Sequence, residues 1–261
     1  MVVICVTVSF VTATRYLGPV GKGVSGSQFF DCDDNNEYLV KFFDRRKTII
    51  NELVGGCLAM RIGLPTPKVS LVQITHDLIN LSDGLKTRKV ESGLHVGSRL
   101  QNITDFDKIT LQTLDDYTLV NHQDLYGVVC FDTWLLNGDR DNRGNNMIEF
   151  LSNDRIRYWM VDFSPCFTGS DWTESSLAIE KHSLGLMPMF NDLFQKYLTD
   201  KRNFNDWFDR LDTVLDAEIQ DIIDTIPVQW SLHPGERSEI LDTIKLRRGL
   251  VRIIINGNVG I

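Results

Sequence analysis

Cysteine is scarce in this sequence, and its spacing suits neither disulfide bonds nor a zinc site. The five cysteines are odd in number and widely scattered, and no two of them have C-x-x-C spacing. This pattern argues against a disulfide-stabilised secreted domain and against a zinc-binding module. We expect a protein of the reducing cytoplasm.

Long hydrophobic runs are also missing. The apolar start, MVVICVTVSFVT, is shorter than the roughly 18 residues that a membrane span needs, and it has no basic segment before it. Its valines and threonines are typical of a β-strand. We therefore predict a strand here, and no membrane association.

Positive charge is in deficit. The formal net charge is -8 and the sequence pI is about 5.1, which argues against a protein that follows the phosphate backbone of a nucleic acid. The sequence also contains no Walker A motif and no G-x-S-x-G nucleophile motif. Nucleic-acid binding and serine-hydrolase chemistry are therefore not expected.

The residues that are present predict an α+β protein with two unlike halves. Hydrophobic residues make up 43% of the chain, enough for a sizeable core. The order up to about residue 70 is strand, glycine loop, strand, helix (48–62) and strand, and the polar stretch SDGLKTRKVESG resembles an exposed connector. Helices are expected to dominate beyond it, at 205–215, 217–226 and 235–250.

The first candidate site is a glycine-rich loop, G-K-G-V-S-G. Such a loop opens a helix in dinucleotide-binding folds, but here the next predicted element is the strand YLVKFF, as in the flap of a kinase. Glycines let backbone N–H groups approach phosphates closely, and neighbouring serines can add hydroxyl donors. The candidate nucleotide-binding residues of this loop are Gly21, Gly23, Ser25, Gly26 and Ser27.

Lys41 and Glu52 form the second candidate feature. Lys41 lies in an otherwise apolar strand, so a buried ammonium there would need an anionic partner such as a phosphate or a carboxylate. Glu52 follows on a predicted helix, on the face that carries Gly56 and Ala59, where it can pair with Lys41. The alternatives are an outward-facing lysine on an edge strand and a solvated helix carboxylate.

The most specific segment runs from Phe131 to Phe163, where a helix leads into a polar loop, a strand hairpin and a further acid. Asp139 is expected in the loop, Asn145 or Asn146 at the start of the first strand, and Asp162 at the end of the second. These oxygen ligands suit Mg²⁺.

Two other interpretations of the loop DRDNRG were considered. An EF-hand would need an oxygen ligand at Arg143 and a glutamate at Phe150, and the sequence has neither. A simple turn rich in Asp and Asn remains the other possibility, although an aspartate at the end of the following strand disfavours it.

Taken together, these motifs resemble the HipA-like kinases, which are distantly similar to phosphatidylinositol kinases and protein kinases. The resemblance covers most of the chain and rests on TRYLGPVGKGVSGS, YLVKF, NELVGGCLAMRIGLPTPKVSLV, GLHVGSRL, NGDRDNRGNNMI and VDF. It implies a bilobal protein-kinase-like fold with a small β-rich N-lobe (residues 1–98) and a mostly helical C-lobe (residues 99–261).

The resemblance also implies roles for the candidate residues. Lys41, supported by Glu52, would contact the ATP phosphates, Asp139 would be the catalytic aspartate, and Asn146 (or Asn145) and Asp162 would hold Mg²⁺. Residue 141 is Asp where many relatives have histidine, and the spacing from Asp139 to the metal-binding asparagine is longer than in some members.

The implied function is ATP- and Mg²⁺-dependent transfer of the γ-phosphate to a hydroxyl, most simply a serine or threonine of a protein substrate. Two alternatives stay open: an ATP-binding pseudokinase that regulates a partner without turnover, and a kinase of a small molecule or lipid. The sequence identifies neither the acceptor nor the oligomeric state.

Overall fold

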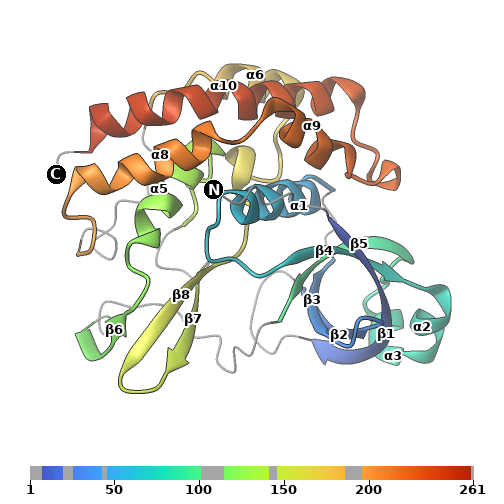
Figure 1. Cartoon of the computed structure of the whole chain (residues 1–261). Coiled ribbons are helices and arrows are strands. Elements are labelled where there is room, and N and C mark those ends of the chain that lie inside the picture. Colours follow the sequence, from blue (N-terminus) through green and yellow to red (C-terminus); the bar gives the residue numbers. More distant parts are fainter. Residues whose placement is uncertain are drawn as a thin grey trace.

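The computed structural model describes residues 8–19, 26–42, 46–100, 115–140, 146–185 and 196–259, with the side chains of residues 46, 146 and 147 left aside. Figure 1 shows a small barrel beside a larger part in which long helices lie above a strand hairpin. The expected α+β composition, with strands early and helices late, is confirmed. Among the described residues, no helix is both long and apolar enough to cross a membrane.

The N-terminal part is a closed five-stranded barrel in the order β1-β2-β3-β5-β4. Neighbouring strands are antiparallel except for β1 and β4, which run parallel. Inward residues alternate along the strands and fill the barrel with a small core of its own, which includes Phe30, Tyr38 and Val40. The strands are β1 (Ser9–Pro19), β2 (Gln28–Cys32), β3 (Glu37–Lys41), β4 (Val69–Ile74) and β5 (Gly93–Arg99).

Helix α1 (Arg46–Arg61) connects β3 to β4 and begins two residues before the predicted position. It ends where Gly63 adopts a positive φ of 78° and Pro65 follows, as expected for a helix stop. Its apolar face, including Leu53, Val54 and Cys57, belongs to the larger core that the C-terminal helices share. The lobe boundary after residue 98 stays a prediction, but α1 packs across it.

The segment predicted as an exposed connector, residues 82–93, is exposed or partly exposed except at Leu85, but it also contains a short helix that was not predicted. Thr75 caps α2 (His76–Leu81) by accepting a hydrogen bond from the N–H of Leu78, and α3 (Asp83–Thr87) follows directly. Leu85 is fully buried in the barrel core. Buried Leu85 and partly buried Val90 pack this segment on the barrel core, and Leu78 of α2 packs there as well.

The C-terminal part contains a three-stranded sheet in the order β6-β8-β7 and a mostly helical layer. Helix α5 is buried along nearly its whole length, as a helix without a polar face should be. The expected hairpin is present, and α10 runs to Asn258, well past the predicted end at residue 250. The elements are β6 (Thr118–Leu119), α5 (Asp124–Trp134), β7 (Asn146–Leu151), β8 (Arg155–Met160), η1 (Cys166–Thr168), α6 (Glu174–Glu180), η2 (Lys201–Phe204), α8 (Asn205–Asp212), α9 (Asp216–Asp224), η3 (Val228–Trp230) and α10 (Pro234–Asn258).

Two helical glycines give a matched test of this packing. At Gly127 on α5, an added Cβ would lie 2.4 Å from the ring of Trp207, whereas at Gly249 on α10 it would meet nothing within 4 Å. We expect Gly127→Ala to lower the free energy of unfolding by about 1–3 kcal/mol through overpacking. Gly249→Ala should raise it by about 0.4–1 kcal/mol, because alanine restricts the unfolded chain. Urea unfolding measures both, and equal effects at the two positions would contradict the described packing of α5 on α8.

Candidate active site

Lys41 ends strand β3, which lies between β2 and β5 and is therefore not an edge strand. Its side chain is only 11% exposed and points away from the barrel core, toward α1. The ammonium forms ion pairs with Glu52 and, at 3.0 Å from Oδ1, with Asp162. Asp162, which is 121 residues from Lys41 in the sequence, therefore meets Lys41 and Glu52 at one buried cation.

Glu52 is the carboxylate of α1 that faces this cation. Its side chain is 4% exposed, and Oε1 accepts hydrogen bonds from Lys41 and from the backbone N–H of Ser164, the latter at 3.0 Å. Burial raises the pKa of Glu52 to about 7, although Lys41 opposes this shift. The alternative of a solvated helix carboxylate does not fit this position.

Asp162 follows β8 by two residues and adopts a left-handed backbone conformation, with φ of 60°. Its Oδ1 accepts hydrogen bonds from Lys41 and, at 2.6 Å, from the Ser164 hydroxyl. Burial alone would raise the pKa of Asp162, but Lys41 and these hydrogen bonds hold it well below its usual value. Asp162 is therefore ionised, and its side chain, 31% exposed, is more accessible than that of Lys41 or Glu52.

Asp139 lies in the loop after α5, and its side chain is exposed. The loop is anchored from inside: Asn137 is fully buried, its Oδ1 accepts from the Asp139 N–H at 3.4 Å, and its amide donates to Asp132 at 2.8 Å. The side chain of Asp139 is therefore exposed, while its backbone is held by a buried support.

The sequence analysis assigned no role to Arg140 and Asp132, which form an ion pair with both side chains fully buried. The guanidinium donates to both Asp132 oxygens, at 2.6 and 3.3 Å, and to the carbonyl of Val161 at 2.8 Å. Arg140, the residue after Asp139, thus bonds directly to Val161, the residue before Asp162. The available signal was Asp132 itself, a lone acid in the apolar run CFDTWLL.

The remaining predicted site residues are only partly within the described chain. Gly26 has the positive φ expected of a loop glycine, 63°, and its carbonyl accepts from Gln28 at 2.7 Å. Ser27, next to it, is buried. Asn146 begins β7 opposite Met160, which puts its backbone at the predicted strand start. Outside the described residues lie Gly21, Gly23, Ser25 and Asn145.

The described acids fit a Mg²⁺ ion that is bound partly through phosphate oxygens. No cluster of three or more metal-ligating His, Cys, Asp or Glu side chains occurs in the described ranges, so the protein alone offers no closed metal cage there. Mg²⁺ commonly takes only one or two carboxylates and completes its shell with substrate phosphates and water. An ionised, partly exposed Asp162 beside Lys41 is compatible with that arrangement.

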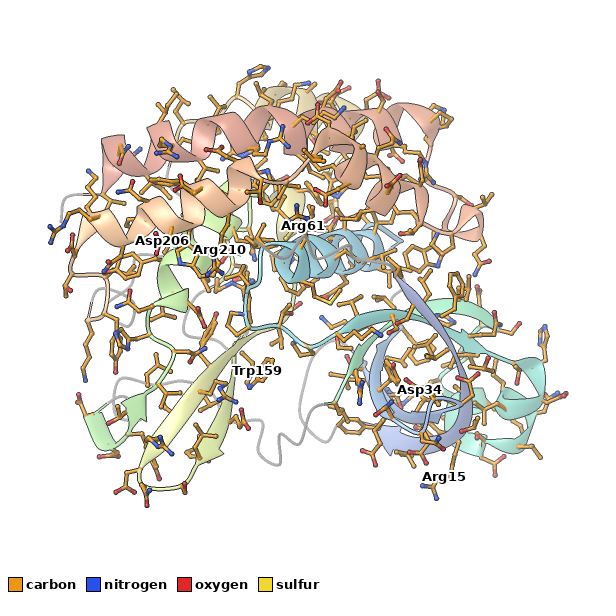
Figure 2. All side chains as sticks on the ribbon, in the orientation of Figure 1. Arg15, Asp34, Arg61, Trp159, Asp206 and Arg210 are labelled. Atoms are coloured by element: carbon orange, nitrogen blue, oxygen red, sulfur yellow. The ribbon has the colours of Figure 1, made fainter. Side chains whose placement is uncertain are left out.

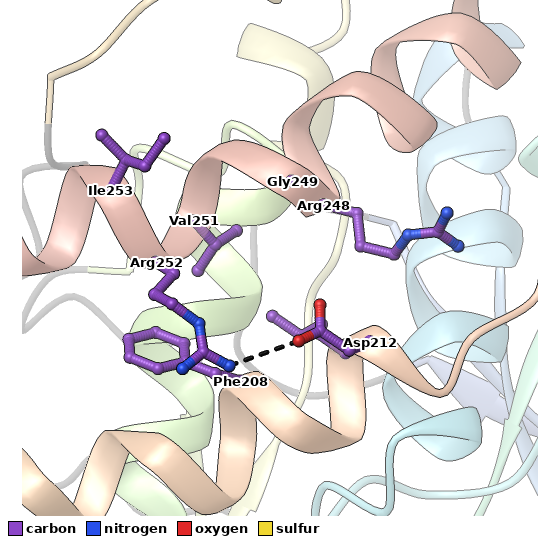
Figure 3. A pocket seen from close by; sticks show the side chains of 8 residues that line it. Phe208, Asp212, Arg248, Gly249, Val251, Arg252 and Ile253 are labelled. Atoms are coloured by element: carbon purple, nitrogen blue, oxygen red, sulfur yellow. Dashed lines mark hydrogen bonds and ion pairs between the residues drawn. The ribbon is translucent and has the colours of Figure 1, made fainter.

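A separate shallow groove lies between α8 and α10, with a volume of about 110 Å³. Figure 3 shows Arg252 over the ring of Phe208 and paired with Asp212. None of the predicted site residues lines this groove.

Helix α1 also contacts the C-terminal helices directly. Figure 2 shows Arg61 of α1 near Arg210 of α8, and Arg210 donates to the carbonyl of Ile62 at 3.3 Å.

Comparison with known proteins identifies one family and several solved structures with a similar fold. The family model described as HipA-like kinase matches residues 15–253. The proinflammatory kinase CtkA of Helicobacter pylori has a similar structure, with a TM-score of 0.65 and 14% sequence identity over 98% of this chain and 100% of that one. Hydra Fam20, solved with sugar, has a TM-score of 0.53 and 12% identity over 96% of this chain and 87% of that one. A search of curated proteins gives no match.

Proposed function

The chain belongs to the HipA-like kinase family, and from this premise we propose that it transfers the γ-phosphate of ATP to a hydroxyl group, using Mg²⁺. The observation that carries the proposal is the meeting of Lys41, Glu52 and Asp162 at one point, with Asp139 on a loop tied to the same strand end. A lysine between two such acids is the arrangement that kinases use to position phosphates and metal.

Lys41 binds and orients the phosphates in this proposal. Glu52 holds the ammonium from the α1 side, and its own position is fixed by the N–H of Ser164. Because the group is buried, its electrostatic effect on a phosphate is stronger than it would be in water. Lys41 thereby offsets negative charge as the phosphoryl group leaves ADP.

Asp139 is the proposed catalytic residue on the acceptor side. Its exposed carboxylate orients the acceptor hydroxyl and takes its proton as the new O–P bond forms and the bond to ADP breaks. Asp162 and Asn146 would hold Mg²⁺, with Asn145 as the alternative to Asn146. When bound, this ion neutralises charge on the phosphate oxygens.

The acceptor is proposed to be a serine or threonine of a protein, in the cytoplasm. The four described cysteines, all buried and free of disulfides, are compatible with that compartment. A small-molecule or lipid acceptor is the competing possibility, and it predicts labelled product outside the protein fraction.

The test is phosphate transfer from γ-labelled ATP to extract proteins by the wild type, Asp139→Ala and Asp162→Ala. We expect Mg²⁺-dependent labelling of serine or threonine by the wild type, and a loss of about 10²-fold or more in each variant. Equal labelling by all three proteins would refute the assignment. Thermal stabilisation by Mg·ATP without any transfer would instead favour the pseudokinase alternative.

A further inference from the structure

Asn51, the residue before Glu52 on α1, is fully buried and makes four hydrogen bonds. Its side-chain amide donates to the carbonyls of Ser164, Cys166 and Gly169 at 2.8, 2.8 and 2.9 Å. Its Oδ1 accepts from the indole N–H of Trp172 at 2.9 Å. Since carbonyls only accept and an indole N–H only donates, the amide orientation is determined; the amide has two hydrogens for three carbonyls, so one hydrogen is shared between two of them.

Three carbonyls can converge on one amide because the backbone after Asp162 is unusually folded. Phe167 and Thr168 have φ of 59° and 71°, and Gly169 has φ of 108°. Left-handed conformations of bulky residues are costly and persist only where the surroundings over-determine them. The buried amide of Asn51 supplies such surroundings for the segment 164–169.

This segment touches both acids that hold Lys41. The carbonyl of Ser164 accepts from Asn51, while its N–H donates to Glu52 and its hydroxyl donates to Asp162. Asn51 therefore reaches Asp162 through a single intervening residue, and it does so without contacting the phosphate or metal position itself.

The same segment also reaches the loop that carries Asp139. The N–H of Phe167 donates to the carbonyl of Leu135 at 2.7 Å, and that of Thr168 donates to Leu136 at 3.1 Å. These two leucines directly precede Asn137, whose side chain accepts from the Asp139 N–H. The segment thus contacts Glu52 and Asp162 directly and also holds the start of the loop that carries Asp139.

Helix α1, which carries Asn51, is held in place by contacts near both of its ends. Near the start, Lys47 pairs with Glu236 of α10 and lies 3.9 Å from the ring centre of Trp172. At the end, Arg61 donates two hydrogen bonds to Glu218 of α9, at 2.7 and 2.9 Å.

We propose that Asn51 is a positioning residue that fixes the segment 164–169 against α1 and so holds Asp162 in register with Glu52 and Lys41. The part of this inference that concerns Mg²⁺ use rests on the proposed function. The part that concerns the segment does not, because it describes the folded chain alone.

The main test variant is Asn51→Leu, which keeps the approximate shape but removes the hydrogen bonds to three carbonyls and one indole N–H; the carbonyl of Cys166 keeps its bond from the N–H of Gly169. Because a buried polar group that loses its partner is costly to keep out of water, local opening of the segment should become at least about tenfold more frequent. The rate of amide hydrogen exchange in peptides covering residues 163–172 measures the frequency of this opening. In turnover assays, the half-saturating Mg²⁺ concentration should rise by about tenfold, because Asp162 is less well placed.

Asn121→Leu is the matched control. Asn121 also uses its amide to hold backbone, bonding the N–H and carbonyl of Tyr158 at 2.9 and 3.0 Å, but it lies on the β8 side and does not contact the segment. We expect it to destabilise the protein without changing exchange at 163–172 or the Mg²⁺ requirement.

Unchanged exchange at 163–172 in Asn51→Leu, or the same change in Asn121→Leu, would overturn the proposal. Faster exchange with an unaltered Mg²⁺ requirement in an active enzyme would overturn the positioning role. A wild type without turnover would refute the proposed function, while the exchange result would still decide what Asn51 does to the segment. Should Asn51→Leu fail to fold, Trp172→Phe, which removes the indole donor to Asn51 and also shrinks the ring beside Lys47, must show the same changes to a smaller degree.

Discussion

Replacing Lys41 with methionine should lower kcat/KM for phosphate transfer by at least about 10²-fold, the loss typical when one charge-stabilising donor is removed from an active site. Methionine has a similar length and is tolerated in a buried position, but it offers no charge to the phosphates. The variant also leaves Glu52 and Asp162 facing each other without the cation that both contact. Initial rates of phosphate transfer at several concentrations of Mg·ATP give kcat/KM for the wild type and the variant.

A second variant separates catalysis from folding. In Lys41→Met the two acids repel each other when both are ionised, so the melting temperature should fall at alkaline pH, whereas Lys41→Met combined with Glu52→Gln removes that repulsion. We expect the double variant to regain much of the lost thermal stability and none of the activity. If Lys41→Met kept near wild-type kcat/KM, or if the double variant regained activity, Lys41 would not be the phosphate-binding residue.

The buried pair of Asp132 and Arg140 should give the largest effect on stability. Removal of one partner leaves an uncompensated charge in the core, which typically costs about 3–5 kcal/mol. Because whole domains are stable by only about 5–15 kcal/mol, Arg140→Met should show a large fall in the urea midpoint. Loss of the Arg140 bond to Val161 should also disturb Asp162.

The matched control for this prediction is the pair of Arg157 and Glu149 on the hairpin, where the arginine side chain is 43% exposed. Arg157→Met should cost below about 1 kcal/mol, as exposed pairs usually do. The double variant Asp132→Leu with Arg140→Met should lose less than the sum of its single changes, since no unpaired charge remains. A loss in Arg140→Met no greater than that in Arg157→Met would contradict the buried position of the pair.

Much of the fold could be predicted from the sequence because local patterns of apolar and turn residues indicate the individual strands and helices. The strand YLVKFF, the helix that contains Glu52 and the hairpin that ends near Asp162 are each visible as periodicity and turn residues. Their meeting at Lys41 was inferred from the order of motifs known in kinases. Local pattern alone gives no distance between Lys41 and Asp162, which are 121 residues apart.

The residues that were missed act through long-range contacts. Asn51 stands in the quoted motif NEL, but its partners lie more than a hundred residues away, so nothing local distinguishes it from a helix asparagine. Arg140 looks like part of a polar loop and is in fact buried. The short helices α2 and α3 were missed because their polar composition outweighed the capping residue Thr75 and the two buried leucines, Leu78 and Leu85.

The central claim is that the acids gathered around Lys41 support Mg²⁺-dependent use of ATP, and ADP release by purified protein tests it most directly. The rate is compared for the wild type and Asp162→Ala, each with Mg·ATP and each with the metal removed by chelator. We predict ADP release that requires both Mg²⁺ and Asp162. Release that persists without the metal or in Asp162→Ala would contradict the claim.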